Sequence, residues 1–217
     1  MVVRTSTLAA VLLTVFAFIP VPSGQAFAFY KSGDVVFSED WESGDLGLWD
    51  VYMGPGYVNA FSSQNEWRIV DESLEPQVSP NAHSGRYYAY AGFSVGSLTY
   101  GPYANTVLES KIIDIRGASH PILSFYAAGA SEAGYDRLNV YVFDYVKKDY
   151  YKLMELSEDG LDNPLPKYER HEIDLKPYKD SGAIGSGRIM LTFQFLSDST
   201  IQEGQGWNLD DIMVVEK

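Results

Sequence analysis

The acidic residues with the clearest potential to bind a ligand or a metal ion lie near the C-terminal end of the chain. Asp210 and Asp211 stand between Leu209 and Ile212, two apolar residues three positions apart. A regular strand turns alternate side chains to the same face, so it cannot bury both of these apolar residues. We therefore predict a β-bulge at Asp210 and Asp211, because bulges often re-aim side chains beside functional sites.

A second acidic pair has the spacing of a catalytic motif. Glu172 and Asp174 are two positions apart, so alternation along a strand turns both carboxylates to one face. Glycoside hydrolysis needs two carboxylates that flank the scissile bond, and jelly-roll glycosidases similar to the laminarinases and agarases carry a further Glu after such a pair. Here Lys176 and Pro177 follow instead. We expect a solvated strand face before a turn at Pro177, with a polysaccharide hydrolase or lyase as an alternative function.

Other catalytic and metal-binding motifs are missing from the sequence. The three histidines, His83, His120 and His171, are scattered, and none belongs to a His-Glu-x-x-His helix. The chain has no cysteine, which excludes disulfides and thiolate chemistry. The acidic loop at residues 157–163 lacks the regular spacing and the closing Glu of an EF-hand. We therefore expect a protein that is not an enzyme.

Aromatic residues are the other candidates for ligand contact, because the chain has 16 tyrosines and 4 tryptophans. Exposed Tyr and Trp rings offer flat apolar faces with a polar edge, which suits stacking on sugar rings or anchoring a protein contact. We expect core positions for Trp41, Trp49 and Trp207. The candidates for ligand binding are the aromatic residues near predicted loops, Tyr57, Trp67, Tyr100 and Tyr103.

Short β-strands separated by Gly- and Pro-rich joints are predicted to position these residues. Alternation of apolar with other side chains is clearest at residues 138–143 and 189–196. Further strands are predicted at residues 35–39, 66–70, 86–91, 106–113, 122–127, 150–156, 168–175 and 207–215. No long amphipathic helix is expected. The pattern indicates an all-β fold, an antiparallel jelly-roll β-sandwich.

The N-terminal residues have the layout of a secretory signal peptide. Arg4 precedes an apolar run at residues 8–19, and small residues at positions 26 and 28 suit a signal peptidase. We predict cleavage after Ala28, a single domain at residues 29–217, and a secreted, extracellular product that does not insert into a membrane. The formal net charge of −13 disfavours binding to nucleic acid, because phosphates are repelled.

Four stretches, in this order along the chain, carry a family resemblance. Together they resemble the MAM-like jelly-roll module, in the bacterial form attached to immune inhibitor A metallopeptidases and to cleaved-adhesin or choice-of-anchor surface proteins. The stretches are Phe-Ser-Glu-Asp-Trp-Glu-Ser-Gly-Asp-Leu-Gly-Leu-Trp at 37–49, Ala-His-Ser-Gly-Arg-Tyr-Tyr-Ala at 82–89, Ile-Leu-Ser-Phe-Tyr at 122–126 with Tyr-Asp-Arg-Leu-Asn-Val-Tyr-Val at 135–142, and Gly-Trp-Asn-Leu-Asp-Asp-Ile-Met-Val at 206–214.

The resemblance implies a concanavalin-like sandwich that binds a structural cation and serves adhesion or substrate targeting. In such a topology the first and last strands are neighbours, which would bring Asp40 and Glu42 near Asp211. Carboxylates gathered in this way repel one another unless a cation lies among them, and calcium accepts six to eight such oxygens. Backbone carbonyls at residues 83–86 would complete the shell.

Other roles remain open for these acidic residues. In one alternative, Asp210 and Asp211 cap a strand end and pair with Arg86 or Arg137. Asp40 and Glu42 then face solvent. Asp136 is a further candidate ligand, and it is equally suited to accept hydrogen bonds in a turn.

The combined pattern predicts a secreted, non-catalytic binding or adhesion module that calcium stabilises and that recognises a glycan or a cell-surface protein. An alternative is a structural subunit of an extracellular matrix or filament, in which the apolar segment at residues 29–37 adds as a strand to a neighbouring subunit.

Overall fold

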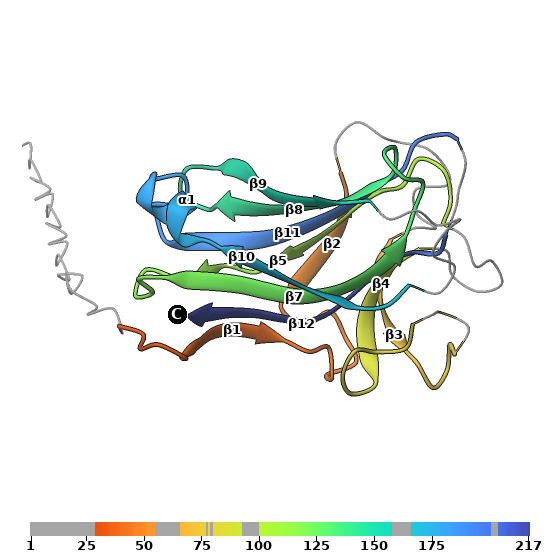
Figure 1. Cartoon of the computed structure of the whole chain (residues 1–217), viewed down its shortest axis with the longest axis horizontal. Helices are drawn as coiled ribbons and strands as arrows, with labels where there is room; N and C mark the ends of the chain where they lie inside the picture. Colours follow the sequence, from red (N-terminus) through yellow and green to blue (C-terminus); the bar gives the residue numbers. More distant parts are fainter. Residues whose placement is uncertain are drawn as a thin grey trace, which may run out of the picture.

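The strands of the chain form two antiparallel sheets packed face to face (Figure 1). The computed structural model describes residues 29–54, 66–76, 78, 80–92, 100–157, 166–200 and 204–217. The predicted signal peptide, residues 1–28, lies outside these residues. Within the described part of the chain, no helix is long and apolar enough to cross a membrane.

Each sheet has six strands among the described residues. Sheet A has the order β10 (Glu169–Asp174), β7 (Pro121–Ala130), β12 (Gly206–Glu216), β4 (Tyr87–Ala91) and β3 (Trp67–Asp71), and β1 (Val35–Glu39) also pairs with β12. Sheet B has the order β2 (Trp49–Met53), β5 (Asn105–Ser110), β11 (Arg188–Leu196), β8 (Arg137–Asp144) and β9 (Asp149–Leu156), and β6 (Ile113–Asp114) also pairs with β11. The all-β sandwich expected from the sequence is therefore confirmed.

The core between the sheets is rich in aromatic rings. Trp41 and Trp49 are buried, as predicted, with ring centroids 5.4 Å apart. Phe193 of β11 lies 6.0 Å from Trp49 and 5.2 Å from Phe125 of β7. Trp207 is buried as well. These contacts join the N-terminal stretch to both sheets.

Strand alternation sets which side chains leave the core. In β8 and β11 the residues predicted to face inward, including Val140 and Phe193, are completely buried. Their neighbours Tyr141 and Gln194 are half-buried on the opposite face of sheet B. This outer face of sheet B is therefore built from the polar and aromatic positions of the alternating pattern.

Three elements differ from the prediction. β2 is a strand that the sequence analysis did not predict. The strand predicted at residues 106–113 is divided into β5 and β6. The turn predicted at Pro177 is a short helix, α1 (Lys176–Asp180), with this proline in its first turn, where its missing N–H costs no hydrogen bond.

The first strand is paired within its own chain. Val35 lies opposite Val215, and Glu39 lies opposite Ile212. β1 thus borders β12 (Figure 1), as the resemblance implied for the first and last strands. The part of segment 29–37 that forms a strand here already has a partner within its own chain, and the filament-subunit alternative stays a prediction.

Candidate functional site

The last strand bends where its two aspartates lie. The pairing of β12 with β7 shifts in register between Asp210 and Met213, and Asp211 has a φ of 46°. Leu209 and Ile212 are both completely buried, so the predicted bulge is confirmed. β12 pairs with β4 before the bulge and with β1 after it, which places both aspartates where β12 changes from one partner strand to the other.

These aspartates hold the loop at residues 82–87. Asp210 Oδ2 accepts hydrogen bonds from the backbone N–H of His83 at 2.8 Å and of Ser84 at 3.2 Å. Asp211 accepts one from Ser84 Oγ at 2.9 Å, and its Oδ2 lies 2.6 Å from His83 Nδ1. The His83 ring stacks on Tyr126 with centroids 3.5 Å apart. The loop is thereby fixed over β7 and β12.

The other end of the same loop is held by Glu42. Its Oε1 accepts hydrogen bonds from the backbone N–H of Arg86 at 2.8 Å and of Tyr87 at 2.9 Å. At Gly85, which has a φ of +62°, an added Cβ would lie 2.2 Å from Glu42 Cδ, so only glycine allows this close approach. Asp40 is exposed, and its Oδ1 accepts a hydrogen bond from the Glu42 N–H at 3.1 Å.

The structure therefore brings Glu42 and Asp211 to one loop and places Asp40 at its margin. The arginines considered as alternative partners of the aspartate pair form their ion pairs with other acidic residues. Arg86 forms an ion pair with Asp71 at 2.5 Å, and Arg137 forms one with Glu155 at 3.5 Å. That alternative pairing is wrong, because backbone N–H groups and His83 take the place expected for an arginine.

Asp210 is the carboxyl group with the most unusual environment at this loop. Burial raises its pKa to about 7, the neighbouring charge of Asp211 acts in the same direction, and the hydrogen bonds from backbone N–H groups oppose both effects. Two residues earlier, Asn208 is completely buried, and its Oδ1 has no hydrogen-bond donor among the described residues. At and just before the bulge, β12 thus carries the Asp210 carboxyl, whose pKa is raised to about 7, and the Asn208 amide oxygen, which has no donor among the described residues.

A second acidic group, Glu132, Asp136 and Asp198, could hold a metal ion. Their nearest carboxylate oxygens all lie within 4.8 Å of one another, and within the described residues this is the one group of three that meets this distance. The carboxylates of Asp40, Glu42 and Asp211 do not form a group of this spacing. Asp136, considered from the sequence as both a ligand and a turn acceptor, is 1% exposed.

Hydrogen bonds assemble this second group. Burial raises the pKa of Asp136, and hydrogen bonds from Tyr100 Oη and from the Asp198 N–H oppose this effect. The hydrogen bonds from Thr200 lower the pKa of Asp198. Thr200 Oγ1 also lies 3.1 Å from Glu132 Oε2. All three residues offer the oxygen ligands that calcium and magnesium prefer.

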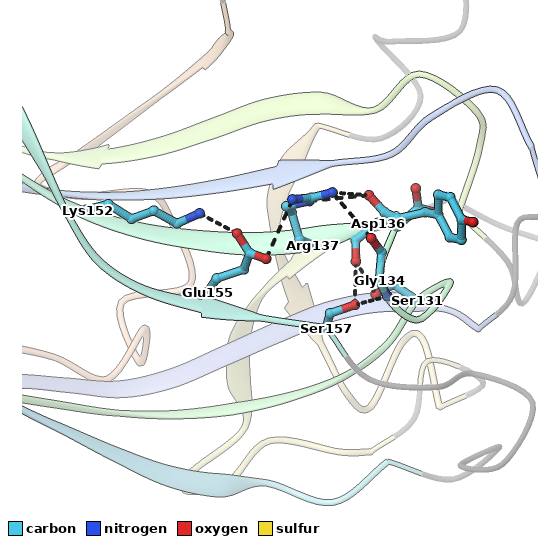
Figure 2. A network of polar contacts seen from close by, with 8 residues as sticks. Ser131, Gly134, Asp136, Arg137, Lys152, Glu155 and Ser157 are labelled. Carbon is cyan, nitrogen blue, oxygen red and sulfur yellow. Dashed lines mark hydrogen bonds and ion pairs between the residues drawn. The ribbon is translucent and has the colours of Figure 1, made fainter.

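A polar network fixes the turn that carries two of these acids (Figure 2). Ser157 Oγ donates to the Asp136 carbonyl and accepts from the Gly134 N–H, both at 2.9 Å. On the same side, Arg137 and Lys152 both form ion pairs with Glu155. The turn between β7 and β8 is therefore tied to β9.

The structure places the predicted ligand-binding aromatics in different environments. Trp67 is 2% exposed and Tyr100 is 1% exposed, so neither ring offers a face to a ligand from solvent. The Trp67 backbone N–H donates to Thr106 Oγ1 at 3.1 Å, which draws this residue into the sandwich. Tyr103 is half-buried with a φ of 58°. Tyr57 lies outside the described residues.

Other tyrosines line a hollow on the outer face of sheet B. Its volume is about 260 Å³, and the described residues that line it are Tyr52, Val107, Tyr141, Tyr150, Thr192 and Gln194. The sequence analysis did not select these tyrosines. The signal for Tyr141 was present, because it alternates with the buried Val140 and Val142.

The acidic pair considered for catalysis lies on the other sheet. Glu172 and Asp174 are both exposed on β10, at the edge of sheet A. Glu172 forms an ion pair with Arg170 at 2.8 Å, and Asp174 lies 2.9 Å from His120 Nε2. The two carboxylates therefore share an exposed strand face, as the alternation predicted.

Comparison with known proteins identifies the fold. No protein-family profile matches the chain, and no curated protein matches it. The K1 cleaved adhesin domain of Lys-gingipain from Porphyromonas gingivalis W83 is similar, with a TM-score of 0.55, 14% identity, and coverage of 83% of this chain and 98% of that domain.

Two further structures are similar to the same extent. The K2 cleaved adhesin domain of Lys-gingipain gives a TM-score of 0.53 and 19% identity, with 82% of this chain and 98% of that domain covered. TmCBM61, solved in complex with β-1,4-galactotriose, gives a TM-score of 0.51 and 17% identity, with 82% of this chain and 94% of that module covered. The chain therefore has the sandwich fold of these modules, which confirms the fold that the resemblance implied.

Proposed function

We propose that this chain is an exported, non-catalytic binding module that calcium stabilises and that recognises a glycan or a cell-surface protein. The observation that carries this proposal is the hollow on the outer face of sheet B. Tyrosines and polar side chains line it together, and this mixture is typical of ligand sites, where aromatic surface supplies contact area and a few polar groups supply orientation.

The structural neighbours support the same class of function. One of them is solved in complex with β-1,4-galactotriose, and two are cleaved adhesin domains. Folds of this kind host many functions, so the argument rests on the tyrosine-lined surface, and the neighbours show only that this sandwich is compatible with binding.

Calcium has two candidate positions in this proposal. The group of Glu132, Asp136 and Asp198 already has the required oxygen spacing. At the 82–87 loop, Glu42 and Asp211 now accept hydrogen bonds from loop groups, and a cation there would have to replace some of them. The donor set at both positions consists of oxygens, which suits calcium.

A hydrolase is less well supported by the geometry. Glu172 and Asp174 lie on β10 of sheet A, whereas the tyrosine-lined hollow lies on sheet B. Each carboxylate also has its own basic partner. A glycosidase needs both carboxylates beside one bound sugar.

Binding without turnover is the expected result when the purified protein is incubated with immobilised polysaccharides and with intact cells. We expect retention on at least one of these surfaces, no release of soluble sugar, and equal retention of the Glu172→Gln variant. Retention is measured by sedimentation, and product by a reducing-sugar assay. Release of sugar that Glu172→Gln abolishes would contradict the proposal in favour of a hydrolase.

A further inference from the structure

Two residues that line the hollow, Tyr150 and Thr192, are joined through one carboxylate beside it, that of Glu109. Tyr150 Oη donates to Glu109 Oε1 at 2.9 Å, and Thr192 Oγ1 lies 3.1 Å from the same atom. These residues come from three strands, β9, β5 and β11. Such bonds hold the Glu109 carboxylate in one orientation, so it is a preorganised hydrogen-bond acceptor on the outer face of sheet B.

The walls of the hollow come from opposite edges of sheet B. Tyr52 on β2 is 37% exposed, and Tyr150 on β9 is 50% exposed. The Tyr150 ring packs on Phe143, with centroids 4.5 Å apart, and lies edge-on to Tyr141 at 6.3 Å. Because protein contacts fix this ring, stacking a ligand on its open side loses little conformational entropy.

A second hollow adjoins the first. Its volume is about 410 Å³, and Tyr141 lines both hollows. Asn139 lines the second hollow and is 2% exposed, and its Oδ1 has no hydrogen-bond donor among the described residues. A buried acceptor without a donor costs free energy, so a ligand that donates a hydrogen bond here would be stabilised.

The rim of the second hollow also carries an exposed ring. Tyr135, in the turn between β7 and β8, is 62% exposed. The two basic residues of this hollow, Arg137 and Lys152, both form ion pairs with Glu155 (Figure 2). Glu155 offsets one of these two positive charges, and Asp198, which also lines this hollow, offsets the other, so the basic groups do not select an anionic ligand.

The combined surface has the chemistry of a sugar-binding site. It presents tyrosine rings on three strands, β2, β8 and β9, and in one turn, with the Glu109 carboxylate beside the first hollow and the buried Asn139 amide oxygen at the second. A pyranose supplies the complement, with a C–H face that stacks on an aromatic ring and hydroxyl groups that donate hydrogen bonds. The net charge of −13 and the Glu109 carboxylate repel anionic ligands.

We propose that the two hollows form one binding surface for a chain of neutral sugar residues, which runs across the outer face of sheet B between Tyr150 and Tyr135. This inference rests on the proposed binding function and assigns it a place and a ligand class. The first hollow binds one part of the glycan through Glu109 and the tyrosine rings, and the second binds its continuation through Asn139.

Calorimetric titration of the purified protein with neutral oligosaccharides tests this inference. The panel is β-1,4-galactotriose, cellotriose, mannotriose and chitotriose, with trigalacturonate as the anionic comparison. The variants are Tyr150→Ala in the first hollow, Glu109→Gln beside it, and Tyr135→Ala in the second hollow. Tyr145→Ala, which removes a half-buried tyrosine outside both hollows, is the matched control.

We expect the wild-type protein to bind at least one neutral oligosaccharide and not trigalacturonate. Each of the three hollow variants should weaken binding at least tenfold, which corresponds to about 1.4 kcal/mol, and Tyr145→Ala should bind like the wild type. Thermal unfolding of each variant confirms that the fold is retained.

Two results would overturn the inference. One is the absence of binding to every neutral oligosaccharide of the panel, and the other is binding that the three hollow variants leave unchanged. If the wild-type protein is still retained on intact cells or on immobilised polysaccharide, the binding function stands and only this surface assignment fails. If it is retained on neither, both proposals fail.

Discussion

Lowering the pH from 8 to 5 is expected to stabilise the wild-type protein relative to Asp210→Asn by on the order of 2 kcal/mol when a chelator is present. Burial raises the pKa of Asp210 to about 7 in the folded protein, whereas an exposed aspartate has a pKa near 4. The folded state therefore binds this proton more tightly than the unfolded chain. The resulting stabilisation is complete at acidic pH and is lost as the pH rises through 7.

Chemical denaturation of both proteins at several pH values measures this effect. Asp149→Asn, a change at an exposed residue of β9, is the control. The difference in free energy of unfolding between this control variant and the wild type should stay constant between pH 5 and 8. If the difference in free energy of unfolding between the wild-type protein and Asp210→Asn is the same at pH 5 and pH 8, Asp210 is ionised throughout this range.

Adding calcium is expected to stabilise the protein by about 2.7 kcal/mol once its free concentration is roughly 100 times the dissociation constant. For a domain of this size, that corresponds to a rise of roughly 5–10 °C in the melting temperature. The rise follows because a cation that binds only the folded state relieves the repulsion among Glu132, Asp136 and Asp198, which lie within 4.8 Å of one another.

Two variants distinguish the candidate positions of the ion. Asp198→Asn removes a carboxylate from the closely spaced group, and Asp211→Asn removes the β12 carboxylate that contacts the 82–87 loop. We expect Asp198→Asn to abolish the rise, while Asp149→Asn, a change at an exposed residue of β9, leaves it intact. Loss of the rise in Asp211→Asn alone would move the ion to the loop. No rise in the wild-type protein would remove calcium from the proposal.

The bulge in β12 shows what strand periodicity can establish. Leu209 and Ile212 could both be buried only if the strand gained a residue between them, and both have no exposed surface. The same reasoning predicted that Val140 of sheet B faces the core and that Tyr141 faces away from it. Alternation is a local property, so it predicts faces of strands without knowledge of their partners.

The group of Glu132, Asp136 and Asp198 could not be predicted in the same way. Asp198 is far from the other two in the sequence, and it reaches them because β11 pairs with β8, with Leu196 opposite Arg137. Register between strands depends on the whole packed core. Tyr100 was misplaced for a similar reason, since its hydroxyl group bonds to Asp136 in the interior.

The tyrosine-lined hollow needed the three-dimensional structure as well. Tyr52 and Tyr150 belong to β2 and β9, the two edges of the five-stranded path of sheet B. Tyr150 reaches Glu109 of β5 across the intervening strands. Proximity to a loop therefore failed to predict exposure for Trp67 and Tyr100, which are buried, whereas the exposed rings of Tyr52 and Tyr150 lie on strands.

Hydrogen–deuterium exchange, with and without the glycan or cell-surface fragment that the binding screen identifies, locates the ligand directly. A binding module whose ligand lies on sheet B should show slower exchange in β5, β8, β9 and β11, and little change in β10 or the 82–87 loop. Protection confined to β10 and that loop would contradict the assignment of the ligand to the outer face of sheet B.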